Sequence, residues 1–147
     1  MRLRTASEVI AFVKKMEGES AAFYDRLAQQ FAAQGEIFRS FAAQNRRNST
    51  EIERAYYSVI TDALEGGFAF NLDIDQYASP PALPDAMPLA DATREAIAVE
   101  DRILSLYAEA IAQSKTLMAD IPRAFEIAAR KRKDRRQKLD LLAGAGT

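Results

Sequence analysis

The sequence predicts an all-α fold: a four-helix bundle built from two antiparallel helix hairpins that are joined by a long crossover loop. Two observations carry this prediction. Apolar residues recur at spacings of three and four along four long segments, as on the buried face of a helix. A stretch without this period, residues 66–88, separates the second segment from the third. With 147 residues the chain has the length of one domain, so we expect residues 1–147 to form a single domain.

The predicted helices have recognisable ends. Ser7 is the predicted cap of the first helix, and a turn at Gly35 makes the first two helices an antiparallel hairpin. Asp120 is the predicted cap of the fourth helix, with Pro122 in its first turn. The predicted helices span about residues 7–33, 36–64, 90–113 and 121–143.

The loop at residues 66–88 is long enough to act as a crossover. Its 23 residues can span about 75 Å when extended at ~3.3 Å per residue. A helix of the length predicted for the second segment is about 43 Å long at ~1.5 Å per residue. The loop can therefore run the length of the bundle, so that the second and third helices lie parallel.

Composition excludes several classes of function. The chain contains no cysteine and no histidine, which rules out disulfides, thiol nucleophiles, histidine-based triads and zinc sites with His or Cys ligands. Its 20 basic and 21 acidic residues leave a net charge of -1, so nothing attracts it globally to nucleic acid or a membrane. The first segment has neither the apolar core of a signal peptide nor the length of a membrane span, and we expect a cytoplasmic protein.

Carboxylates interrupt two of the apolar stripes. Glu17 lies in the stripe of the first helix, seven residues before Tyr24, and Glu100 lies in the stripe of the third, seven residues before Tyr107. Two helical turns place each Glu and its Tyr on one face. Since a buried carboxylate must be paired, hydrogen-bonded or metal-bound, these positions mark a candidate site. The shared spacing also indicates that the second hairpin repeats the first.

The second and fourth helices carry polar breaks of their own. Asn45 and Asn48 interrupt the second stripe, and Lys131 and Asp134 interrupt the fourth. The fourth stripe is predicted as Ala124, Ile127, Ala128, Leu139 and Leu142. We expect one buried polar layer in which Lys131 compensates the carboxylates, the asparagines hydrogen-bond them and the tyrosine hydroxyls donate to them. Its predicted members are Glu17, Tyr24, Asn45, Asn48, Glu100, Tyr107, Lys131 and Asp134.

This pattern, over about residues 7–143, resembles the rubrerythrin-like branch of the ferritin-like superfamily. The resemblance implies a di-iron centre held by one Glu from each of the first and third helices and a Glu-x-x-His pair from each of the others. Glu17 and Glu100 match the single ligands, but the pairs fall on residues 45–48 and 131–134, which lack both histidines and the bridging glutamates. The resemblance thus implies a degenerate di-iron site whose remaining metal ligands would be Glu17, Glu100 and Asp134.

The sequence predicts a non-catalytic binding or structural role, with no catalytic residue, no cofactor and no identifiable small-molecule substrate. Iron is implied by the resemblance alone. We expect a homodimer, no membrane contact and no nucleic-acid partner. One alternative is a di-iron-type oxidoreductase, a ferroxidase or peroxide reductase, with atypical ligands. Another is a helical adaptor that uses the basic end of the fourth helix, residues 130–136.

Overall fold

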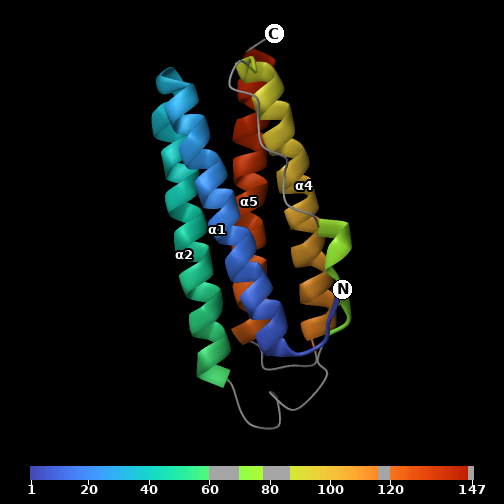
Figure 1. Ribbon diagram of the computed structural model, residues 1–147. Coiled ribbons are helices and arrows are strands. Elements are labelled where there is room, and N and C mark those ends of the chain that lie inside the picture. Colours follow the sequence, from blue (N-terminus) through green and yellow to red (C-terminus); the bar gives the residue numbers. More distant parts are fainter. Residues whose placement is uncertain (60–69, 78–86, 116–119, 146–147) are drawn as a thin grey trace.

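The computed structural model describes residues 1–59, 70–77, 87–115 and 120–145, and over these ranges the protein is an all-α bundle (Figure 1). The all-α prediction is confirmed. No helix of the described ranges combines the length and the apolar character that crossing a membrane requires. The long helices are α1 (Ala6–Gln30), α2 (Gly35–Val59), α4 (Leu89–Ser114) and α5 (Asp120–Ala145).

Helix α1 differs slightly from its predicted bounds. Its cap is Thr5 rather than Ser7: the Thr5 hydroxyl accepts from the Glu8 main-chain N–H at 3.2 Å, and the Glu8 carboxylate accepts from the Thr5 N–H at 3.0 Å. This reciprocal capping box outcompetes a single serine cap because it satisfies two free N–H groups. The helix ends at Gln30, since a 3₁₀ turn, η1 (Ala32–Gln34), leads into α2.

The other predicted bounds lie close to the observed ones, with one part untested. Helices α4 and α5 begin at Leu89 and Asp120, each one residue before its predicted start. The predicted end of the second helix, residues 60–64, and most of the predicted loop 66–88 lie outside the described residues.

The directions of the helices follow from contacts between their side chains. Tyr24 of α1 contacts Glu100 of α4, and Glu17 of α1 contacts Tyr107 of α4, so these two helices run antiparallel. Figure 1 shows the same arrangement, with α1 and α5 running one way and α2 and α4 the other. Helices α2 and α4 are therefore parallel to each other.

A described part of the segment between α2 and α4 packs against the bundle. Strand β2 (Leu72–Asp73) pairs antiparallel with β1 (Arg2–Leu3) and leads into a 3₁₀ turn, η2 (Ile74–Tyr77). The Gln113 side chain of α4 accepts from the Asn71 main-chain N–H at 2.7 Å and donates to its carbonyl at 3.1 Å. These bonds fix the segment to α4.

The buried apolar residues of the bundle form two clusters. One contains residues such as Val13, Leu106 and Phe125, and the other contains residues such as Leu27 and Leu139. Between the clusters, near the middle of the helices, the buried residues are polar or charged. The core is therefore divided by a polar layer, which is the candidate site.

Candidate functional site

Two carboxylates from α1 and α4 form the centre of the polar layer. Glu17 and Glu100 both have 0% of their surface exposed. Each accepts a hydrogen bond from a tyrosine of the opposite helix: the Tyr24 hydroxyl donates to Glu100 Oε1 at 2.7 Å, and the Tyr107 hydroxyl donates to Glu17 Oε1. The repeated Glu–Tyr spacing thus produces two crossed pairs, in which each helix supplies one donor and one acceptor.

Arg132 of α5 lies between the two carboxylates and is itself fully buried. Its Nη1 donates to both oxygens of Glu100, at 2.8 and 2.7 Å. Its Nη2 donates to Glu17 Oε2 at 2.8 Å, and its Nε reaches Glu17 Oε1 at 3.3 Å. A guanidinium suits this position because its planar donors can bind two carboxylates at once.

Arg135, one turn further along α5, extends the layer towards α2 and is 1% exposed. Its guanidinium lies over the Tyr24 and Phe41 rings, 5.1 and 5.0 Å from their centroids, which adds a cation–π attraction. The acceptors of its Nη1 are Asn45 Oδ1 at 2.6 Å and Glu100 Oε1 at 3.1 Å, and those of its Nη2 are Gln44 Oε1 at 2.8 Å and the Phe41 carbonyl at 3.1 Å.

The charges of the layer balance: two carboxylates face two guanidinium groups. Burial by itself would raise the pKa of Glu100, but the charges of Arg132 and Arg135 outweigh it and lower that pKa below its usual value. Burial likewise opposes the charge on Arg132, yet Glu100 and Glu17 raise its pKa well above the usual one. Glu100 and Arg132 therefore both stay ionised at neutral pH.

The two tyrosines remain neutral donors. Burial, reinforced by the neighbouring carboxylate, raises the pKa of both Tyr24 and Tyr107 well above the ordinary value of 10.0. A phenol in such a place stays protonated, and its hydroxyl donates a hydrogen bond to the carboxylate. The hydroxyl supplies a further hydrogen bond to a carboxylate oxygen that the arginines also contact.

The two asparagines of α2 behave differently. Asn45 accepts from both arginines, with Arg132 Nη2 at 3.3 Å, and its own Nδ2 donates to Ser20 Oγ at 2.9 Å. Asn48 is 2% exposed, but its Nδ2 has no hydrogen-bond partner in the described part of the chain. Asn48 instead lines a groove between α2 and α5.

The structure corrects the predicted contribution of the fourth helix. Asp134 is exposed and Lys131 is only partly buried, so neither belongs to the layer that holds Glu17 and Glu100. Ile127, predicted as core, is 40% exposed. Ala128 and Leu139 are buried as predicted, but the polar members of the inward face lie one residue later than predicted. This face of α5 consists of Ile121, Phe125, Ala128, Arg132, Arg135 and Leu139.

Arg132 and Arg135 are the residues that the sequence interpretation missed. They have the same spacing of three as Lys131 and Asp134, so polar spacing alone does not choose between the two faces. The signal that does choose is Phe125, a bulky aromatic residue that is fully buried and sets the phase of the stripe.

The donors in this layer do not fit a dimetal centre. The Arg132 guanidinium stands between the carboxylates of Glu17 and Glu100, where it would repel a metal cation. Asp134, the third ligand implied by the resemblance, is exposed. Within residues 1–59, 70–77, 87–115 and 120–145, no group of three or more His, Cys, Asp or Glu side chains could hold a metal ion.

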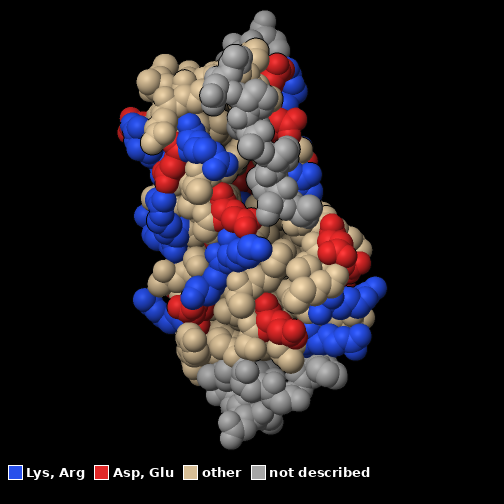
Figure 2. Space-filling view, in the orientation of Figure 1, with Lys and Arg blue, Asp and Glu red and all other residues tan. Residues whose placement is uncertain are grey.

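The basic segment 130–136 does not form a continuous cationic surface. Arg132 and Arg135 point into the layer, and Arg136 pairs with Asp101 and Asp140, both at 2.6 Å. On the face shown in Figure 2, basic and acidic side chains are intermixed. Two of the basic residues on which the adaptor alternative depends, Arg132 and Arg135, are therefore buried and cannot contribute to a cationic surface.

In comparisons with known proteins, no family model, no curated protein and no solved structure matches the chain.

Proposed function

We propose that this protein is a non-catalytic, ferritin-like bundle with a binding or structural role, in which a Glu–Arg layer takes the place of a di-iron centre. The observation that carries the proposal is the position of Arg132, whose guanidinium donates to both Glu17 and Glu100. It supplies the positive charge and the directed donors that two buried carboxylates need.

The directions of the helices support the ferritin-like part of the proposal. Helices α2 and α4 are parallel, which is the arrangement of bundles with one crossover connection. The crossed pairs of Glu17 with Tyr107 and Glu100 with Tyr24 further support a duplicated hairpin.

A structural role suits the chemistry of the layer. Replacing a buried ion-pair network by apolar side chains often leaves stability unchanged, whereas removing one partner is costly. The layer of this protein joins all four helices, through Glu17, Asn45, Glu100 and Arg132. Its hydrogen bonds are directional, so they select one register of the four helices over others that apolar packing would also tolerate.

The proposal is tested by metal analysis of the purified protein. The chain is expressed with added iron, purified aerobically and measured by mass spectrometry for metal content, and then titrated with ferrous iron and oxygen. We expect far less than one iron per chain and no ferrous oxidation above that of buffer. The matched variant Glu17→Gln, which keeps the side-chain volume, should give the same values.

Stoichiometric iron in the wild type that is lost in Glu17→Gln would overturn the proposal. That outcome would favour the di-iron-type oxidoreductase, because it would show that Glu17 binds metal in preference to Arg132. Circular dichroism of both proteins establishes that the comparison is made between folded chains.

A further inference from the structure

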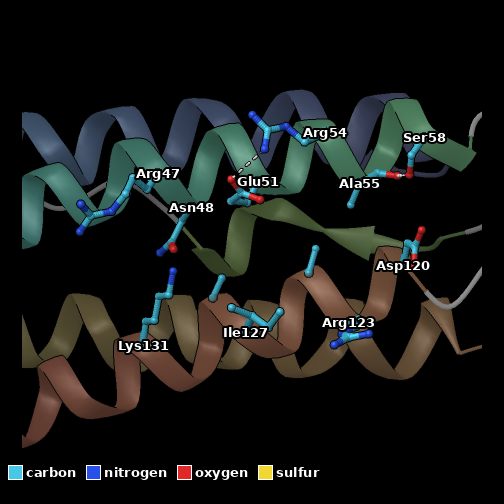
Figure 3. A pocket seen from close by; sticks show the side chains of 12 residues that line it. Arg47, Asn48, Glu51, Arg54, Ala55, Ser58, Asp120, Arg123, Ile127 and Lys131 are labelled. Carbon is cyan, nitrogen blue, oxygen red and sulfur yellow. Dashed lines mark hydrogen bonds and ion pairs between the residues drawn. The ribbon is translucent and has the colours of Figure 1, made fainter.

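A groove of about 630 Å³ runs between α2 and α5, next to the buried layer (Figure 3). Its volume lies within the ~300–1,000 Å³ of typical small-molecule sites. Eight of the twelve lining side chains are polar, and four of those are Arg or Lys against two acidic ones. The lining residues are Arg47, Asn48, Glu51, Arg54, Ala55, Ser58, Asp120, Arg123, Ala124, Ile127, Ala128 and Lys131.

At one end of the groove, three donor side chains have few or no acceptors among the described residues. The Asn48 carboxamide and the Lys131 ammonium face each other across it, one from each helix (Figure 3). The Nδ2 of Asn48 is buried and has no partner, and neither Lys131 nor Arg47, at the same end, forms an ion pair within the described ranges. The nearest acidic side chain of the lining, Glu51, is paired with Arg54 at 3.4 Å.

The neighbouring part of the groove is apolar. Ala124, Ile127 and Ala128 of α5 and Ala55 of α2 line it. Ile127 is 40% exposed and lies in the middle of the groove (Figure 3). A ligand that lies along the groove from Lys131 towards Ser58 would therefore contact cationic side chains at one end and apolar side chains beyond it.

We propose that this groove binds an amphiphilic oxyanion. A carboxylate or phosphate head would accept from Asn48 Nδ2 and Lys131, with Arg47 adding a second cation, and a short alkyl chain would cover Ala124 and Ile127. The head complements a positive end of the groove and gives the buried Asn48 donor the acceptor it lacks. The inference rests on the proposed binding role, for which it names the class of ligand.

The test uses the full chain and defined probes. Binding of octanoate, octyl phosphate and octyltrimethylammonium is measured by calorimetry, and the site is located from amide chemical shifts. We expect both anions to bind and to shift amides of α2 and α5 around the groove, and the cation to leave them unchanged. The tighter of the two anions identifies the head group. Inorganic phosphate and acetate should bind more weakly than the octyl compounds, because they lack the chain.

Variants locate the head-group site. Lys131→Gln should weaken both anions about fivefold, as expected for a partly exposed charge pair. Asn48→Asp, which keeps the volume but presents a carboxylate, should weaken them further. Lys138→Gln removes an exposed cation from the same helix outside the groove and should leave the affinities unchanged. Thermal unfolding of each variant confirms that it is folded.

The inference is overturned if octyltrimethylammonium binds as well as the anions, if Lys131→Gln and Lys138→Gln have equal effects, or if inorganic phosphate binds as tightly as octyl phosphate. These outcomes are separate from the test of the layer. Iron bound at Glu17 with intact anion binding would remove the proposed metal-free layer but leave the groove site in place.

Discussion

Consecutive residues of α5 belong to two polar regions with opposite properties. Arg132 is fully buried in the layer, where every one of its nitrogens donates to an acceptor, and the neighbouring Arg135 leaves its Nε without a partner among the described residues. Lys131, about 100° away round the helix, lines a groove in which the Nδ2 of Asn48 has no partner among the described residues. A polar group whose bonding is complete within the fold holds the structure together, whereas one left incomplete beside an open groove can bind something else.

Removing the buried cation of the layer should have the largest effect on the free energy of unfolding. Arg132→Ala leaves Glu17 and Glu100 buried without their shared partner and should lower the free energy of unfolding by ~3–5 kcal/mol. Lys131→Ala, at the groove, should change it by no more than about 0.5 kcal/mol. Urea denaturation followed by circular dichroism measures both values.

A second variant at position 132 tests the shape of the donor as well as its charge. Arg132→Lys keeps the positive charge but lacks the fork that reaches both carboxylates, so its loss of stability should fall between those of Arg132→Ala and the wild type. Equal urea midpoints for the position-131 and position-132 alanine variants would show that the layer is not a paired network.

The two asparagines of α2 provide the second contrast. Asn45→Leu removes the acceptor of Arg135 and Arg132 and the donor to Ser20, and should cost about 2–3 kcal/mol because it leaves buried charged donors unsatisfied. Asn48→Leu removes a donor that has no partner and should alter the unfolding free energy by less than about 1 kcal/mol. Thermal or urea unfolding of the pair measures the difference, and a larger loss for Asn48→Leu would contradict the assignment of the two regions.

The tyrosine hydroxyls should make a smaller contribution. Tyr24→Phe removes one donor to Glu100, which still accepts from both arginines, so the expected cost is about 1–1.5 kcal/mol. Tyr57, which is 65% exposed, provides the control, and Tyr57→Phe should have no measurable effect. Equal stabilities for the two variants would mean that the hydroxyl of Tyr24 adds nothing to the layer.

The contribution of Glu100 to the free energy of unfolding should depend on pH and decrease in acid. The pKa of Glu100 is lowered in the folded protein relative to the ordinary value of 4.5, because Arg132 and Arg135 outweigh the opposing effect of burial. Above pH 4.5 this stabilisation is fully present, and as the pH falls the unfolded chain takes up the proton first, so stability is lost progressively.

Urea midpoints between pH 7 and pH 3 measure this loss. Glu100→Gln should flatten the acid limb of the curve, whereas Glu95→Gln, an exposed change on the same helix, should leave the limb as it is. An unchanged acid limb in Glu100→Gln would show that Glu100 is not held ionised by the arginines.

Much of the layer could be predicted from the sequence, because α1, α2 and α4 have one apolar face each. Glu17, Asn45 and Glu100 interrupt stripes that are mainly apolar, and the structure buries all three fully. The four-helix pattern is predictable for the same reason, as hydrophobic period decides which residues face inward.

The contribution of α5 could not be predicted in the same way. Its sequence carries cations on both sides of the stripe, and Ile127 and Ala124 make the wrong face look apolar. Local spacing therefore does not distinguish Lys131 and Asp134 from Arg132 and Arg135. Phe125 is the sequence signal for the correct face, and the structure agrees with it, since the arginines are the cations of this segment that reach the carboxylates of α1 and α4.

The groove was also beyond sequence reasoning. It depends on how α2 and α5 pack side by side, and its lining combines residues, such as Asn48 and Lys131, that the sequence predicts to be internal. Whether a polar residue in a stripe ends in a closed network or beside an open space is decided by the neighbouring helix.

Urea unfolding of the wild type in excess chelator and in excess ferrous iron, under anaerobic conditions, tests whether Arg132 holds Glu17 and Glu100 without a metal. Anything that binds only the folded state stabilises it in proportion to the logarithm of its concentration. We expect the same free energy of unfolding in both solutions. A clear gain in stability with iron that disappears in Glu17→Gln would contradict this expectation.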